Sequence, residues 1–163
     1  MEYEYGIVPL TQGAFAIVDP DDIVDISQYK WHITTKGYAA RRRRVSEGGG
    51  IELLHRRILG IEGSAQGDHI NRDKLDNRRA NLRTATGSQN QANRGLDKSN
   101  TTGYRGVTNP RRVPGYVAQI NVGGKSIFLG YFRDKHDAAE AYNLAAREHF
   151  GEYAYQNVID REA

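Results

Sequence analysis

Short hydrophobic runs separated by turn-forming residues make up the first part of the chain. Residues 6–18 (GIVPLTQGAFAIV) predict two short strands joined by a turn at Gln12-Gly13. The turn at residues 19–22 (DPDD) is typical of a helix start, so a short helical stretch is expected up to Tyr29. These elements indicate a small β-rich region at the N-terminus.

A second hairpin is expected from residues 31–33 and 38–45. Its second strand contains the four consecutive arginines of residues 41–44. Because alternate side chains of a strand point to opposite faces, Arg42 and Arg44 should share one face. At least one pair of these arginines must therefore point away from any buried side of the sheet.

The middle of the chain changes from hydrophobic to polar. Residues 46–50 (SEGGG) are typical of a flexible connector, and residues 51–59 form an apolar segment that carries His55. Residues 67–94 are rich in Asp, Asn and Arg, with too few apolar residues for a regular packed element. A long ordered loop with a polar function is expected there, entered by a strand that ends at Asp68-His69.

The C-terminal part has the pattern of a small antiparallel sheet backed by one helix. Three strands are predicted, at residues 103–109, 115–122 and 125–132. The pair Gly123-Gly124 is a strong signal for a tight hairpin between the last two. Asp134 is a suitable N-cap for an alanine-rich helix that runs to about Phe150, and Gly151 stands where that helix should end.

A polar linker at residues 96–102 (LDKSNTT) predicts a boundary between two domains, residues 1–98 and 99–163. The expected fold class is α+β. Hydrophobic residues make up 38% of the 163 positions, which suffices for a modest core, and the absence of cysteine excludes disulfides and thiolate-bound metal. We expect a soluble intracellular protein, because neither a secretory leader nor an apolar run of membrane-spanning length is present.

The net charge of +3 conceals an uneven distribution. Residues 51–99 carry nine Lys and Arg against six Asp and Glu, whereas residues 1–50 carry six against seven. Arg outnumbers Lys, and its guanidinium suits forked contacts with phosphate. Charge alone leaves two interpretations open, polyanion binding and solvated Arg-rich faces.

Asp68, His69 and Asn90 carry the clearest chemical pattern. Hydrolysis of a phosphodiester needs a base that activates water and a divalent cation that neutralises charge on the phosphate. Neutral His is a good base near pH 7, and Asp and Asn oxygens suit hard cations such as Mg²⁺. A short strand after Asn81 and a short helix from Ser88 are expected to turn Asn90 back toward Asp68.

This pattern resembles the HNH endonuclease family, specifically its bacteriophage and intron homing branch. The matching motifs are Asp68-His69, Asp76-Asn77, Asn81-Leu82-Arg83 and Asn90, preceded by Leu54-His55-Arg56. The resemblance covers most of residues 5–94, with its core at 51–94, and implies a ββα-metal nuclease fold after the small β region. The last position of the name-giving triad is Asn90 and not His, which weakens the case for zinc.

The resemblance also implies a role for each matching residue. His69 is expected to be the general base. Asp68 and Asn90 are expected to hold one divalent metal ion, Mg²⁺ or Mn²⁺. Asn81 is expected to brace the loop and to orient His69.

Two neighbouring residues have open assignments. His55 either contacts the site or the phosphate, or is a hydrogen-bonded histidine on a strand. Arg83 either contacts the phosphate or pairs with a loop aspartate. An Asp-His pair before an Asn-rich loop can be a structural turn, but the spacing to Asn81 and Asn90 favours the catalytic interpretation.

Residues 102–157 resemble the DNA-binding domain of plant ethylene-response factors, the AP-two domain. The matching residues are Tyr104-Arg105-Gly106-Val107, Ala118, Ile120, Leu129-Gly130, Phe132, Ala138-Ala139, Ala141-Tyr142 and Ala145-Ala146. The resemblance implies a sheet that lies in the major groove of DNA, which is wide enough to admit strands. The plant target sequence is not carried over, because the plant pattern has more Arg and Trp on this face.

Strand alternation predicts which side chains of this sheet face DNA. The side chains expected to face the helix are Ala118, Ile120, Ile127 and Leu129. Those expected to contact DNA are Arg105, Gln119, Asn121, Ser126 and Phe128, with Arg111, Arg112 and Lys125 near phosphates at the rim. Arg42 and Arg44 of the N-terminal part are further candidates for DNA contact. Tyr104, Tyr116 and Tyr131 are either DNA contacts or core residues, and the core is the more frequent place for aromatics in a small sheet.

These features predict a metal-dependent DNA endonuclease that makes a nick or a double-strand cut. It is expected to act on double-stranded DNA as a monomer, without a protein partner or a membrane, in the cytoplasm of the bacterial host of a phage or mobile element. One alternative is a DNA-binding regulator with a structural or inactive nuclease half, although such a protein need not keep Asp68, His69 and Asn90. The other alternative is an RNA-directed nuclease, which the resemblance of residues 102–157 to a DNA-binding domain disfavours.

Overall fold

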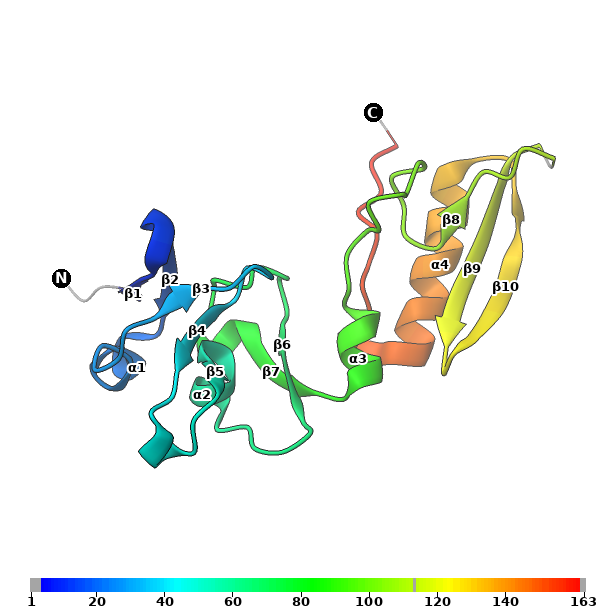
Figure 1. Ribbon diagram of the computed structural model, residues 1–163. Coiled ribbons are helices and arrows are strands. Elements are labelled where there is room, and N and C mark those ends of the chain that lie inside the picture. The colour runs from blue at the N-terminus through cyan, green and yellow to red at the C-terminus, as the bar shows by residue number, and fades with distance from the viewer. Residues whose placement is uncertain (1–3, 113, 162–163) are drawn as a thin grey trace. The chain divides into compact units, whose positions relative to one another are not determined.

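The structure is a computed structural model that describes residues 4–112 and 114–161. The strands (β), α-helices and 3₁₀ helices (η) are, in chain order (Figure 1), β1 (Gly6–Pro9), η1 (Thr11–Gly13), β2 (Phe15–Val18), α1 (Pro20–Ile26), β3 (His32–Ile33), β4 (Ala39–Arg42), η2 (Val45–Glu47), β5 (Ile51–Leu53), α2 (Leu54–Leu59), β6 (Gln66–His69), η3 (Arg79–Asn81), β7 (Leu82–Ala85), α3 (Gly87–Ala92), β8 (Val107–Thr108), β9 (Tyr116–Val122), β10 (Lys125–Phe132), α4 (Lys135–Phe150) and η4 (Gly151–Tyr153). The chain divides into two compact units, Met1–Gly87 and Ser88–Ala163, which we call the N-terminal unit and the C-terminal unit. The α+β fold class predicted from the sequence is confirmed.

The N-terminal unit combines small antiparallel sheets with short helices. β1 pairs with β2, β4 lies between β3 and β5, and β6 pairs with β7. As predicted, the first two strands are joined by a turn at Gln12 and Gly13, both of which have positive φ. Helix α1 begins with Pro20 in its first turn, followed by Asp21 and Asp22, which suit the positive end of a helix dipole.

A hydrophobic core joins these elements. Its buried members are Val8, Leu10, Ala16, Val18, Ile26, Trp31, Ala39, Leu54, Ile58 and Leu82. The indole N–H of Trp31 donates to the carbonyl oxygen of Ile26 at 2.9 Å, so its one polar atom is satisfied inside the core. The side chains of the arginine run alternate as expected. Arg41 is buried, whereas Arg42, at the end of β4, and Arg44, just beyond it, are exposed.

Helix α2 corrects the interpretation of residues 51–59. The strand β5 passes directly into α2, so the alternative of His55 on a strand is wrong. Leu54, His55 and Ile58 are its buried residues, at the spacing that places side chains on one side of a helix. Gly60 ends the helix in the left-handed conformation with a φ of 62°. The helix contacts β6 and β7, which brings His55 to that hairpin.

The polar middle of the chain is more regular than predicted. β6 ends at His69 and β7 begins after Asn81, as expected, but the two strands pair in antiparallel register. The short strand and the short helix expected in residues 67–94 are present as β7 and α3. The expectation that this stretch is too polar for a regular packed element is wrong, because β6 and β7 form a paired hairpin. Backbone pairing satisfies the polar main-chain groups of these strands, although the strands lack the apolar face from which a strand is usually predicted.

The loop between β6 and β7 is attached to the core through strand β2. The backbone N–H of Ile17 donates to the carbonyl of Leu75 at 2.9 Å, and that of Asn77 donates to the carbonyl of Ile17 at 2.8 Å. The second bond comes from a residue with no exposed surface. The loop is thus anchored by hydrogen bonds to the strand of another sheet.

The C-terminal unit is a three-stranded antiparallel sheet, in the order β10-β9-β8, with α4 packed on one face (Figure 1). Asp134 caps the helix as predicted, since its carboxylate accepts from the backbone N–H of His136 at 2.6 Å. Gly151 follows the last helical residue with a φ of 54°. The first strand is shorter than predicted, because Gly103 and Gly106 take positive φ where an extended strand was expected.

The register of β9 and β10 separates the two faces of this sheet. Ala118 and Ile120 are buried beneath α4, and Leu129 is half-buried, as predicted. Ile127 pairs with Ile120 but is exposed, because it lies on an edge strand. A register shift between Phe128 and Gly130 accommodates the extra residue at Leu129.

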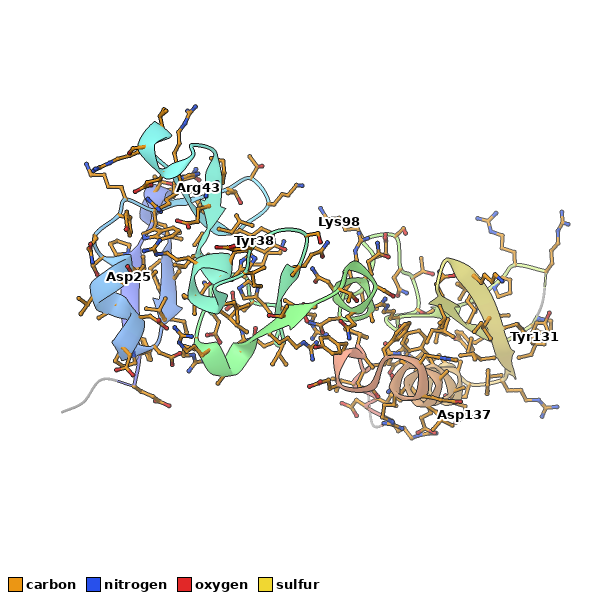
Figure 2. All side chains as sticks on the ribbon, turned by 90° about the horizontal axis from the view of Figure 1, so that it is seen from below. Asp25, Tyr38, Arg43, Lys98, Tyr131 and Asp137 are labelled. Atoms are coloured by element: carbon orange, nitrogen blue, oxygen red, sulfur yellow. The ribbon has the colours of Figure 1, made fainter. Side chains whose placement is uncertain are left out.

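The outer face of the sheet carries the polar residues predicted for it. Gln119, Asn121, Ser126 and Phe128 are all exposed. Tyr131 corrects the core expectation, since its side chain is 65% exposed and its ring centroid lies 4.9 Å from that of Phe128. Figure 2 shows Tyr131 on strand β10.

The division into units differs from the domain boundary taken from the linker at residues 96–102. Helix α3 belongs to the C-terminal unit by its contacts, whereas the linker would leave it in residues 1–98. The domain assignment therefore stays a prediction. Within the residues that the structure describes, no helix is both long and apolar enough to cross a membrane.

Candidate active site

The antiparallel register of β6 and β7 places the two central residues of the motif. Asp68 lies opposite Arg83, and His69 lies opposite Leu82. Directly paired residues share a face of the hairpin and neighbours along a strand alternate, so Asp68 and His69 start from opposite faces. Both are 5% exposed, and β6 ends at His69, where the chain enters the loop.

His69 is held by a residue that the sequence did not single out for this role. Its Nε2 lies 3.3 Å from Oδ1 of Asn77, which is fully buried. The amide of Asn77 is itself oriented, because its Nδ2 donates to the carbonyl of Lys74 at 3.4 Å. With Oδ1 facing the ring, Nε2 of His69 carries the proton and donates it, which leaves the lone pair on Nδ1.

Two further rings surround His69. The ring centroid of His55 lies 5.0 Å away at 77°, and that of Tyr38 lies 6.1 Å away. Tyr38 and His55 also contact each other at 5.4 Å. Tyr38, labelled in Figure 2, stands just before β4, so three separate segments of the N-terminal unit supply this group.

Burial keeps both histidines neutral. It lowers the pKa of His69, although the hydrogen bond to Asn77 and the charge of Asp68 partly oppose the effect. It lowers the pKa of His55 to about 3, with a further contribution from the neighbouring His69. At pH 7 the neutral imidazole of His69 can therefore accept a proton, which is the state that a general base requires.

Asp68 forms a buried ion pair across the hairpin. Its Oδ2 accepts from Nε of Arg83 at 2.8 Å, and Nη2 of Arg83 lies 2.8 Å from the same oxygen. Arg83 thus pairs with an aspartate, although with Asp68 of β6 and not with one of the loop. Burial raises the pKa of Tyr38 and the charge of Asp68 raises it further, so this carboxylate lies close to both Tyr38 and His69.

Asn81 forms two hydrogen bonds with the backbone of the loop. Its Oδ1 accepts from the backbone N–H of Asn71 at 2.9 Å, and its Nδ2 donates to the carbonyl of Asp76 at 2.7 Å. The amide that reaches His69 is however that of Asn77, so bracing and orienting fall to different asparagines. The Asp76-Asn77 pair of the motif is the sequence signal for Asn77, but a pair of this kind is equally typical of a simple turn.

The two motif residues expected to hold a metal ion, Asp68 and Asn90, are both oxygen donors. In the described ranges, no cluster of three or more His, Cys, Asp or Glu forms a metal-binding group. Asp68 offers a buried carboxylate. Asn90 lies on α3, which starts at Gly87, one residue before the expected Ser88, and Asn90 belongs to the C-terminal unit. One carboxylate and one amide oxygen fit Mg²⁺ or Mn²⁺, which keep waters and substrate oxygens as their other ligands.

The basic residues predicted for DNA contact fall into two groups. Arg42, Arg44, Arg111, Arg112 and Lys125 are exposed. Arg105 departs from the prediction, because its guanidinium donates to the carbonyl oxygens of Gln91, Ala92 and Arg94 around the end of α3. Its contacts are those of a residue that holds α3 in the C-terminal unit.

Comparison with known proteins gives two matches. A family profile described as HNH endonuclease matches residues 60–92, which include Asp68, His69, Asn81 and Asn90. The chain is also similar to a protein of Acanthamoeba polyphaga mimivirus named "Uncharacterized HNH endonuclease L560". The two are 37% identical over 155 residues, which cover 91% of this chain and 78% of the relative, so the similarity extends into both units. No solved structure matches the chain significantly.

Proposed function

The chain belongs to the HNH endonuclease family, and from this premise we propose that it is a metal-dependent DNA endonuclease with His69 as its general base. The observation that carries the proposal is the state of His69. It is a buried, neutral imidazole that is held through Nε2 by Asn77 and lies beside the carboxylate of Asp68. These are the properties of a base prepared to take a proton from water at neutral pH.

We propose Asp68 and Asn90 as the protein ligands of one divalent ion, Mg²⁺ or Mn²⁺. When bound, such an ion neutralises charge on the scissile phosphate and on the leaving oxygen. Arg83 holds Oδ2 of Asp68 and so fixes the direction of the carboxylate. Asn81 and Asn71 stiffen the loop that follows His69, which keeps the base in place while substrate binds.

The C-terminal unit is proposed to bind double-stranded DNA through the outer face of its sheet, as in the AP-two domain that it resembles. Gln119 and Asn121 are exposed side chains able to read adenine edges in the major groove. Ser126 and Phe128 complete the face, and Tyr131 joins it because its ring contacts Phe128. Positions for phosphate contact are Arg111, Arg112 and Lys125 at the rim, and Arg42 and Arg44 in the N-terminal unit.

The biological setting is also part of the proposal. A monomer with one such site would nick one strand, and a second molecule would be needed to cut both. A homing or other mobile-element enzyme fits the motif branch that residues 5–94 resemble. The similar mimivirus protein is viral, which agrees with a role on a mobile genome but not specifically with a bacterial host.

Supercoiled plasmid DNA tests the function directly. The purified full-length protein is incubated with plasmid and Mg²⁺ or Mn²⁺, with and without a chelator, and the products are separated by gel electrophoresis. We expect nicked or linear DNA that the chelator abolishes. His69→Ala should lose turnover while its DNA affinity stays close to that of the wild type, and the exposed His149→Ala should behave as the wild type. The absence of cutting with every divalent metal would refute the proposal.

A further inference from the structure

His55 is a buried imidazole in the candidate site with no assigned role. It is only 4% exposed, and it lies on α2 with its ring against those of His69 and Tyr38. Within the described residues, neither of its ring nitrogens has a hydrogen-bond partner in the protein. The other buried polar groups nearby differ, since Asp68, His69 and Asn77 each hold at least one.

The nitrogens of His55 are not sealed inside the protein. Across the described part of the chain, every side-chain nitrogen or oxygen without contact to solvent has a hydrogen-bond partner. The unpartnered nitrogens of His55 must therefore keep some contact with solvent, although the residue as a whole is almost buried. A polar group in this position is available to something that enters the site from outside.

Gly67 allows this imidazole to pack directly against strand β6. A β-carbon at Gly67 would lie 2.4 Å from Cδ2 of His55 and 3.2 Å from Nε2. The backbone of Gly67 does not have positive φ, so its conformation alone does not require glycine. Gly67 and His69 are two residues apart on β6 and share a face, which places the Nε2 edge of His55 beside the strand that carries the base.

We propose that His55 is a second substrate-contacting residue, whose imidazole N–H donates a hydrogen bond to an oxygen of the DNA phosphate under attack. This inference rests on the proposed function and names the contact that His55 adds to it. The group suits the task, because a neutral imidazole has one N–H donor and phosphate oxygens are strong acceptors.

The neutrality of His55 also protects the base. A positive charge 5.0 Å from the ring of His69 would make protonation of His69 harder. With its pKa lowered to about 3, His55 does not carry that charge at neutral pH. It can therefore donate a hydrogen bond without weakening the proton acceptor beside it.

Two substitutions separate the hydrogen bond from the packing. His55→Phe keeps a ring against His69 and Tyr38 but removes both nitrogens, and His55→Gln keeps a side-chain N–H donor. We expect His55→Phe to slow single-turnover cleavage at saturating DNA by about 10- to 100-fold, with a melting temperature near that of the wild type. His55→Gln should regain part of the loss, and His149→Gln should cut at the wild-type rate. A His55→Phe variant that cuts at the wild-type rate would overturn the inference while leaving the nuclease assignment intact.

A readout without cleavage tests the contact by itself. In ¹⁵N-histidine-labelled His69→Ala protein, a short DNA duplex is titrated in the presence of Ca²⁺ and the ring nitrogens of His55 are followed by NMR. The His55 N–H resonance should move on addition of the duplex, and those of His149 should not. If the His55 resonance stays in place while DNA binds, the inference is wrong. If wild-type protein cuts no DNA with any metal, the nuclease assignment fails, and this titration still decides whether His55 contacts phosphate.

Discussion

At the scale of single residues, the site depends on buried polar groups that each have a defined partner. Asn77 binds Nε2 of His69, Arg83 binds Asp68, and Asn81 binds the loop backbone. Asn77 fixes the tautomer of the His69 ring, Arg83 fixes the direction of the Asp68 carboxylate, and Asn81 fixes the conformation of the loop. Preorganisation of this kind lowers the free energy needed to reach the transition state, because the groups do not have to be ordered during the reaction.

Asn77 should control which nitrogen of His69 acts as the base. Asn77→Leu removes the acceptor for Nε2–H, and we expect kcat to fall by roughly 10- to 100-fold while KM changes little. Asn77→Asp keeps an acceptor and should retain more activity. The ¹⁵N shifts of the His69 ring in metal-free protein measure the tautomer directly. Equal proton populations on both ring nitrogens in the wild type would contradict this role.

Gly67 should tolerate no side chain. In Gly67→Ala the new β-carbon would overlap Cδ2 of His55, so we expect a loss of about 1–3 kcal/mol in the free energy of unfolding, together with reduced cleavage. Urea denaturation measures the stability. Gly87→Ala is the matched control, because its β-carbon would meet Gln66 at an ordinary distance of 3.6 Å. Equal stability of the two variants would show that the site adapts without cost.

At the scale of elements, helix ends and strand ends place the functional groups. α2 carries His55 in its first turn and is capped by Gly60, β6 ends at His69, and the guanidinium of Arg105 binds the last turn of α3. The long helix α4 begins at a side-chain cap on Asp134. The three helix contacts, at Gly60, Arg105 and Asp134, satisfy backbone groups that a helix end leaves without partners.

The cap of α4 should make the stability of the C-terminal unit depend on pH. The backbone N–H of His136 lowers the pKa of Asp134 below 3.8, and the charges of His136 and Arg161 and the backbone N–H of Asp137 act in the same direction. Because the folded pKa is the lower one, the cap stabilises the fold fully above 3.8, and this stability is lost as pH falls through the folded value.

Asp134→Asn is the variant that isolates this dependence. It keeps an oxygen acceptor but does not ionise, so its melting temperature should fall less than that of the wild type between pH 5 and pH 2 (about the range in which carboxylates titrate). Asp134→Ala should be less stable than the wild type at pH 7, because the cap is absent. Parallel curves for the wild type and Asp134→Asn would show that the ionisation contributes nothing.

At the scale of the whole molecule, two units with separate cores divide the work that we propose. The N-terminal unit holds His69, Asp68 and His55 against one core, and the C-terminal unit builds its sheet and helix around others. Substitutions at the site in the N-terminal unit should therefore change the cleavage rate, and substitutions on the sheet of the C-terminal unit should change the DNA affinity.

The exposed cations of the C-terminal unit test this division. Arg111→Ala, Arg112→Ala and Lys125→Ala combined should weaken DNA binding and reduce the slope of log K against log salt by about 0.9 for each phosphate that the variant no longer neutralises. The single-turnover rate at saturating DNA should stay at the wild-type value. Fluorescence anisotropy over a salt series measures the slope, and Arg147→Ala on α4 is the control. An unchanged slope would place the DNA contacts of this protein elsewhere.

Local sequence patterns predicted much of the secondary structure. They failed where packing between segments distant in sequence determines the structure. The strand that ends at His69 and the cap at Asp134 follow from residues close in sequence. Residues 51–59 did not reveal a helix, because a short apolar run fits a strand equally well and only packing on β6 and β7 decides. Tyr131 was misplaced because the bulge near Leu129 cannot be inferred from alternation.

The sequence by itself indicated the family, because Asp68, His69, Asn81 and Asn90 resemble the HNH motif and lie within the matched residues 60–92. It also determined the sheet and helix of the C-terminal unit, whose turns and cap are local signals. Only the tertiary structure assigned Asn77 to His69 and brought His55 against it, with Gly67 leaving the space. Such contacts join α2, β6 and a loop anchored on β2, and no local rule of sequence specifies which side chains meet when separate elements pack.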